Sequence, residues 1–214
     1  MMRLHISAPC GKKDNGRPRQ CAESVHEAHR QDSLGAGIPS GEDDGRPYEY
    51  MYAEGRESMP YTIRTMTHEY AAELSQWAYE NEYSIYSFKQ DAAAMDELLN
   101  GDYLACTDQN GRVIGYFCKN ESARIPTGDN YSYSNDKLDI GLGMHPALCG
   151  KGMGYEFLLC GIEYMTRQTP QVPLRLTVAC FNARAISLYK RAGFTVERTV
   201  KHKISGAPFY IMNR

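Results

Sequence analysis

Residues 149–157 read CGKGMGYEF and place three glycines at alternate positions around one lysine. Before them, residues 138–146 read LDIGLGMHP, which resembles a strand, and after them apolar residues recur at helical spacing. A glycine-rich turn between a strand and a helix leaves the first helical N–H groups without partners, and the helix dipole adds partial positive charge there. The stretch therefore predicts a phosphate or diphosphate site, with a plain turn as the alternative.

Two common nucleotide-binding motifs do not fit this stretch. A P-loop needs Gly-x4-Gly-Lys-Ser/Thr, but here Gly152 follows Lys151 and His145 stands where the first glycine would be. A dinucleotide fingerprint needs Gly-x-Gly-x-x-Gly early in a parallel domain, but the spacing here is Gly150-x-Gly152-x-Gly154, late in the chain. The turn therefore belongs to another kind of fold.

Composition narrows the class of protein. The 214 residues carry a formal net charge of −2, which does not favour nucleic acid or an anionic membrane as a partner. No apolar run approaches the roughly 20 residues that span a bilayer, and the N-terminus lacks the apolar stretch of a signal peptide. The seven cysteines show no tight pairing pattern. We expect a reduced, cytoplasmic protein.

Residues 1–58 differ from the rest of the chain. They are dense in Gly, Pro and charged residues and sparse in large apolar ones, which predicts a disordered extension. A regulatory tail is one alternative, and synthesis that starts at Met59 is another. The spacing of Cys10, Cys21, His26 and His29 is unlike that of a zinc finger, so no metal site is expected.

Residues 59–214 predict one α+β domain with a mixed, mostly antiparallel central sheet flanked by helices. Asn-Gly at the tip of a predicted hairpin and capping residues at the helix ends support this interpretation. The expected strands cover residues 61–66, 103–108, 112–120, 137–145, 173–180, 194–203 and 207–212, and the expected helices cover 67–80, 91–99, 152–168 and 182–194.

Two stretches together resemble a known family. HPALCGKGMGYEFL is followed about thirty residues later by LTVACFNARAISLYKRAGF, and this pairing resembles the GNAT family of N-acetyltransferases. The likeness spans residues 59–214 and says nothing of the extension. It implies a GNAT-like acyl-CoA N-acyltransferase fold, acetyl-CoA as the donor, and a small-molecule amine or a protein N-terminal amine as the acceptor.

The resemblance also implies roles for individual residues. Tyr189 would be the general acid beside the sulfur, and Asn182 would bind near the pantetheine or the thioester. The family often has Arg or Gln where this chain has Cys149, so diphosphate binding would depend on backbone N–H groups and Lys151. The complete implied cofactor-binding set is Leu142, Gly143, Met144, Cys149, Gly150, Lys151, Gly152, Met153, Gly154 and Asn182.

The general base is the least determined part of the predicted site. Asp139 lies on the glycine-bearing strand and is the candidate, with an ordinary strand carboxylate near Lys137 as the alternative. His145, Glu156 and Glu163 are weaker candidates, since a loop position explains His145 better and a solvent-facing helix position explains the two glutamates better.

Aromatic residues between the first two helices could shape an amine pocket by cation–π contact or could simply pack on the sheet. They are Trp77, Tyr79, Tyr83, Tyr86 and Phe88. Two functions remain open: an N-acetyltransferase that acts by direct transfer in a ternary complex, and a catalytically silent CoA-binding sensor or interaction module. A homodimer through residues 194–213 is conceivable.

Overall fold

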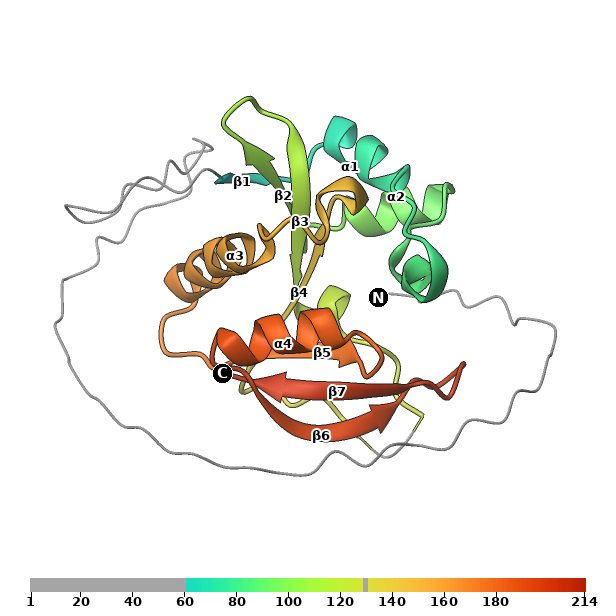
Figure 1. The fold of residues 1–214 in the computed structure, drawn as a ribbon, viewed down its shortest axis with the longest axis vertical. Coiled ribbons are helices and arrows are strands. Elements are labelled where there is room, and N and C mark those ends of the chain that lie inside the picture. The colour runs from blue at the N-terminus through green and yellow to red at the C-terminus, as the bar shows by residue number, and fades with distance from the viewer. Residues whose placement is uncertain (1–60, 129–130) are drawn as a thin grey trace, which may run out of the picture. The chain divides into compact units, whose positions relative to one another are not determined.

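A computed structural model of the chain describes residues 61–128 and 131–214 (Figure 1). The predicted disordered extension, the alternative start at Met59 and the rejected zinc ligands all lie outside the described residues. The statements below concern the two described ranges.

The described strands form one mixed sheet in the order β1-β2-β3-β4-β5-β7-β6. Every neighbouring pair is antiparallel except β4 and β5, which are parallel. This confirms the predicted α+β class with a mostly antiparallel sheet. The strands are β1 (Tyr61–Thr65), β2 (Tyr103–Asp108), β3 (Val113–Lys119), β4 (Leu138–Met144), β5 (Leu174–Ala179), β6 (Thr195–Lys201) and β7 (Pro208–Asn213).

Helices cover both faces of the sheet (Figure 1). Successive side chains of β3 point to opposite faces: Phe117 stacks on Phe157 of α3 at 4.6 Å between ring centroids, whereas Tyr116 packs against Phe88 at 5.4 Å. The α1 and α2 helices thus lie over one face, and α3 and α4 over the other. The helices are α1 (His68–Ser75), α2 (Ala92–Leu98), α3 (Gly154–Gln168) and α4 (Ala183–Arg191).

Local signals in the sequence explain most element boundaries. The side chains of Thr67, Asp91 and Asn182 accept hydrogen bonds from the first turns of α1, α2 and α4. Gly193 follows α4 with a φ of 89°, and Gly111 turns the β2–β3 hairpin with a φ of 77°.

The first helix is shorter than predicted. It ends at Ser75 instead of running to residue 80. Beyond it, the Trp77 ring packs on the edge of the His145 ring at 4.8 Å, and the Tyr79 hydroxyl donates a 2.8 Å hydrogen bond to the Met144 carbonyl. These contacts at the end of β4 draw the chain out of the helical path. Three short 3-10 helices were not predicted: η1 (Asn81–Tyr86), η2 (Asn120–Ala123) and η3 (Pro146–Leu148).

The parallel pair β4 and β5 is joined at one end only. Its partners are Leu138 with Leu174 and Asp139 with Arg175, and beyond them the two strands are no longer paired. The Asp139 carboxylate accepts from Arg175 Nε at 2.5 Å and from Arg175 Nη2 at 2.8 Å. Arg124 Nε donates to the same carboxylate at 2.7 Å. Both Asp139 and Arg175 are almost fully buried, so this ion pair fixes the closed end of the splayed strands.

Replacing Asp139 by asparagine tests that role. The change leaves two guanidinium groups beside a neutral amide, and breaking a buried ion pair costs about 3–5 kcal/mol. We expect the free energy of unfolding in urea to fall by about that amount. Glu197→Gln is the control because it removes an exposed carboxylate that pairs with Lys137 at 3.2 Å, and we expect a loss of less than about 1 kcal/mol. Equal losses in the two variants would contradict the assignment.

Candidate active site

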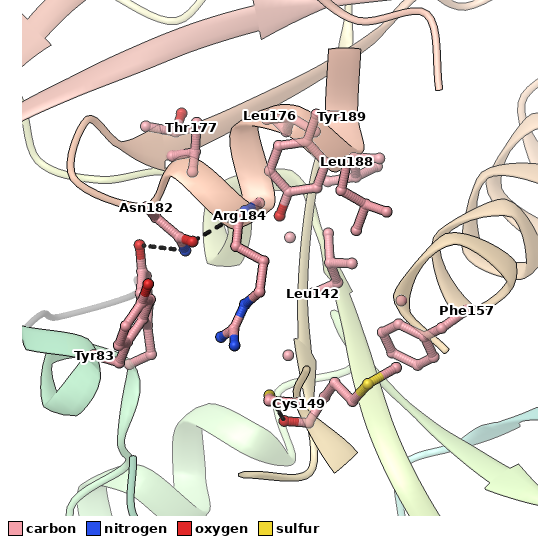
Figure 2. Close-up of a pocket in the computed structure, with 18 of the residues that line it drawn as sticks. Tyr83, Leu142, Cys149, Phe157, Leu176, Thr177, Asn182, Arg184, Leu188 and Tyr189 are labelled. Carbon is pink, nitrogen blue, oxygen red and sulfur yellow. Dashed lines mark hydrogen bonds between the residues drawn. The ribbon is translucent and has the colours of Figure 1, made fainter. Parts of the chain in front are cut away.

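A cavity of about 410 Å³ opens where β4 and β5 diverge (Figure 2). Its wall comes from β4, β5, the turn at residues 149–154, the start of α3, the length of α4, and the segment around η1. Eight of the ten predicted cofactor-binding residues line it, together with Tyr189; the two that do not are Lys151 and Met153. The lining members of the predicted set are Leu142, Gly143, Met144, Cys149, Gly150, Gly152, Gly154 and Asn182.

The β4 strand turns unpaired backbone groups toward this cavity. Leu138 N–H bonds to the Pro173 carbonyl on the β5 side, whereas His145 N–H bonds to the Ile114 carbonyl on the β3 side. Because backbone groups alternate in direction along a strand, Leu142 directs its N–H and C=O toward the β5 side, where β4 has lost its partner. Leu142 can therefore offer a backbone donor and acceptor to a ligand.

The absence of a side chain at Gly143 also has a packing role. A Cβ atom there would collide with the ring of Tyr116 on the neighbouring strand. The missing side chain lets that ring lie flat across β4 as part of the cavity wall. Gly143 thus accommodates a neighbouring side chain, as strand glycines often do.

The turn before α3 has unpartnered backbone N–H groups. Gly150 and Gly152 have φ values of 81° and 83°, which only glycine adopts without strain. Within the described residues, no acceptor bonds to the N–H groups of Gly152, Met153 or Gly154, and no side chain caps α3. These free donors and the dipole of a 15-residue helix suit a phosphate group.

The positively charged side chains that line the cavity are two arginines and not the predicted lysine. Lys151 is exposed and does not line the cavity. Arg184 and Arg191, both on α4, line it instead. The Arg184 guanidinium lies 5.1 Å from the ring centroid of Tyr83, and Arg191 stacks on Tyr155 at 3.8 Å.

Arg184 extends from the start of α4 into the cavity (Figure 2). It approaches Gly150 on the opposite wall, since a Cβ on that glycine would lie 3.9 Å from its Nη1. No carboxylate in the described part of the chain forms an ion pair with it. The position of Arg184 in the first turn of α4 was a signal in the sequence. A cation there is disfavoured by the helix dipole, so its presence suggests a role in binding a ligand.

Asn182 and Tyr189 lie on the same side of α4. Asn182 Oδ1 accepts from Ala185 N–H at 3.1 Å, and its Nδ2 donates to the Tyr86 hydroxyl at 3.3 Å. The Tyr189 hydroxyl points into the cavity, and no described residue forms a hydrogen bond with it. Burial raises the pKa of Tyr189, so the phenol keeps its proton at neutral pH.

The structure argues against Asp139 as the general base. Its carboxylate is occupied by two arginines at the closed end of the strands and does not line the cavity. The weaker candidates are also accounted for elsewhere. His145 Nδ1 accepts from Ala147 N–H at 3.1 Å, Glu163 pairs with Arg167 at 2.6 Å, and Glu156 is exposed.

The aromatic residues of the predicted amine pocket divide into two groups. Tyr79, Tyr83 and Tyr86 line the cavity, whereas Trp77 and Phe88 pack into the core beneath α1 and α2. Burial raises the pKa of Tyr79 and of Tyr86. Burial also raises the pKa of the Cys149 thiol, and the nearby Arg184 opposes that rise only in part.

The fold and the cleft together define an α+β domain with a glycine-rich turn beside a splayed strand pair. The profile of the acetyltransferase (GNAT) domain family matches residues 61–195. The chain therefore belongs to the GNAT acetyltransferase family, as the resemblance had indicated. No curated protein sequence matches it significantly.

Solved structures share this fold. Aminoglycoside acetyltransferase AAC(6')-Ib in complex with ribostamycin and coenzyme A superposes with a TM-score of 0.56 at 22% identity, covering 72% of this chain and 92% of that one. A chimera of Vibrio cholerae spermidine N-acetyltransferase SpeG and hSSAT gives 0.54 at 17% identity, covering 72% and 94%. At these identities the likeness shows the fold alone.

Two features are absent from residues 61–128 and 131–214. None of their helices has the length and apolar character needed to cross a membrane. No group of three or more potential metal ligands was found among their His, Cys, Asp and Glu side chains.

Asn182→Ala tests the cap at the start of α4. We expect the free energy of unfolding to fall by about 1 kcal/mol, because the first turn loses its side-chain acceptor. Asn182→Asp keeps an acceptor at the same position and should unfold within a few tenths of a kcal/mol of the parent. Thermal or urea unfolding of both variants measures the difference, and equal destabilisation would show that the cap contributes little.

Proposed function

We propose that the protein transfers an acetyl group from acetyl-CoA to a primary amine, directly, within a complex that holds both substrates. Family membership supports the reaction class. The observation that carries the proposal is that a turn with free N–H groups and the Tyr189 hydroxyl open onto one cavity.

The residues present fit the donor. The N–H groups of Gly152, Met153 and Gly154 would hold the diphosphate, with Arg184 or Arg191 adding positive charge in place of the exposed Lys151. The unpaired backbone edge at Leu142 would bind the pantetheine arm. When bound, acetyl-CoA supplies an activated acetyl thioester.

The backbone and side-chain groups of the cavity fit the chemistry of acyl transfer. Leu142 N–H can donate to a carbonyl oxygen on which negative charge develops. Tyr189 Oη holds a proton that it can donate to a departing thiolate. Asn182 keeps the start of α4, and with it Tyr189, in place through its bonds to Ala185 and Tyr86.

Direct transfer is favoured over a route through an acyl-enzyme. Cys149 is the nucleophile candidate in the described wall, but its thiol faces the Met144 carbonyl at 3.7 Å and its pKa is raised. No described histidine or carboxylate lines the cavity to activate it.

A silent CoA-binding module is the second candidate, and one observation favours it. No carboxylate lines the described cavity, so the general base that we predicted is missing. Titration with CoA, combined with thiol release from acetyl-CoA across an amine panel, separates the two functions. Binding without release for any amine would support the module and exclude the transferase.

Tyr189→Phe removes the proposed acid. We expect kcat to fall by roughly 10²–10⁴-fold with little change in the KM for acetyl-CoA. The raised pKa of Tyr189 also predicts no loss of parent activity from its ionisation between about pH 7 and pH 9. Tyr61→Phe is the control because Tyr61 is a buried tyrosine that does not line the cavity. Unchanged kcat in Tyr189→Phe would exclude the acid role.

Gly152→Ala tests the turn, and Gly111→Ala is its matched control. Both glycines have a φ near 80°, and a Cβ on either would meet no described atom within 4 Å. Each substitution should therefore cost a similar 1–2 kcal/mol of stability, roughly. Only Gly152→Ala should weaken CoA binding, measured by calorimetry, and equal binding by both variants would count against the diphosphate assignment.

A further inference from the structure

The charges around the cavity are unusual for a site that receives an amine. The titratable side chains among its described lining residues are six tyrosines, one cysteine and two arginines. Aspartate, glutamate, histidine and lysine do not occur in that lining. The described wall thus offers positive charge and aromatic faces, and no anion.

This wall is a poor site for a polycation. A desolvated ammonium group needs a paired anion, and the described wall supplies none. The face of the Tyr83 ring, where an ammonium could bind by cation–π contact, already has the Arg184 guanidinium 5.1 Å from its centroid. A second positive charge in the acceptor would meet that guanidinium.

The same wall is poor at removing a proton from the acceptor. Burial raises the pKa of Tyr79, Tyr86 and Cys149, so these groups are not anions at neutral pH. Asp139 is held by its two arginines. The amine must therefore arrive already neutral. At about pH 7.5, roughly a third of an α-amino group is neutral, against roughly 0.1% of a lysine-like alkylamine.

We assign the acceptor to the part of the wall formed by Tyr79, Tyr83 and Tyr86, which is aromatic. Tyr83 and Tyr86 meet Phe181 at 5.6 and 6.3 Å between ring centroids, and Tyr79 meets Tyr86 at 6.5 Å. Such a surface suits an apolar or aromatic side chain next to the reacting nitrogen.

We propose that the acceptor is a weakly basic α-amine with an apolar or aromatic side chain and no second positive charge. A free amino-acid derivative and a peptide N-terminus both present this chemistry. The inference rests on the proposed function and narrows it.

A matched pair of acceptors tests the basicity. Phenylalanine amide and 2-phenylethylamine carry the same ring, but the carboxamide lowers the pKa of the amine. With the full chain and acetyl-CoA at about pH 7.5, we expect kcat/KM from thiol release to be at least about tenfold higher for phenylalanine amide. A tetrapeptide with N-terminal phenylalanine and a blocked C-terminus then separates the two sources of α-amine.

Spermidine and ribostamycin, which are polycations, test the effect of acceptor charge in the same assay. We expect the lowest kcat/KM for these two acceptors. Equal or faster turnover of either polycation, or of 2-phenylethylamine, overturns the acceptor inference and leaves the acetyltransferase proposal standing. Absence of thiol release with every amine, while CoA still binds, overturns the proposed function and the acceptor inference with it.

Arg184→Glu reverses the charge beside Tyr83. We expect the ratio of kcat/KM for spermidine to that for phenylalanine amide to rise at least about tenfold, because the variant provides the missing anion. Arg191→Glu makes the same charge change beside Tyr155 and should leave this ratio unchanged. The KM for acetyl-CoA, measured for both variants, separates effects on donor binding. An unchanged ratio in Arg184→Glu overturns the role assigned to charge.

Discussion

The contact between Asp139 and Arg175 holds β4 and β5 together at the end where the two strands pair. Above it the strands separate and leave backbone groups free, an arrangement that is stable only if the strands cannot slide or rotate at their base. Buried charges provide this rigidity because any displacement leaves one of them without its partner. The ring of Tyr133 adds to it, with the guanidinium carbons of Arg124 and Arg175 at 5.3 and 5.0 Å from its centroid.

Glycine serves two separate purposes around this opening. At Gly143 it removes a side chain so that Tyr116 can lie across β4, which is a matter of packing. At Gly150 and Gly152 it permits a backbone conformation that other residues avoid, and this conformation leaves the N–H groups before α3 free. Glycines that look alike in the sequence thus shape the wall of the cavity in one case and the proposed anion site in the other.

Much of the fold could be predicted because its signals are local. Periodicity, caps at Thr67, Asp91 and Asn182, and the Asn-Gly turn indicated nearly every strand and helix. The early end of α1 was missed because it depends on contacts with β4, which lies 65 residues further along the chain at the Tyr79–Met144 bond.

The candidate site was predictable in its backbone and less so in its charges. The glycine turn and Tyr189 follow from short motifs, and the structure brings them to one cavity. Asp139 was misjudged because its partners lie 15 and 36 residues away, and no spacing rule reveals them. Lys151 was predicted at the cavity, but Arg184 lines it instead. The direction of a side chain in a turn depends on the glycines beside it, and the sequence does not show this direction. A helix projects its side chains along fixed faces, so the direction of Arg184 follows from its position in α4.

The bond from Tyr79 to the Met144 carbonyl has a consequence for how this protein can diversify. It fastens the segment that bears the aromatic wall to the strand that would carry the donor, and the Trp77–His145 contact provides a second attachment next to it. Substitutions between residues 80 and 86 can therefore remodel one side of the cavity while β4 stays in register. Related enzymes could acquire new acceptors through this short stretch without rebuilding the machinery for the acyl group.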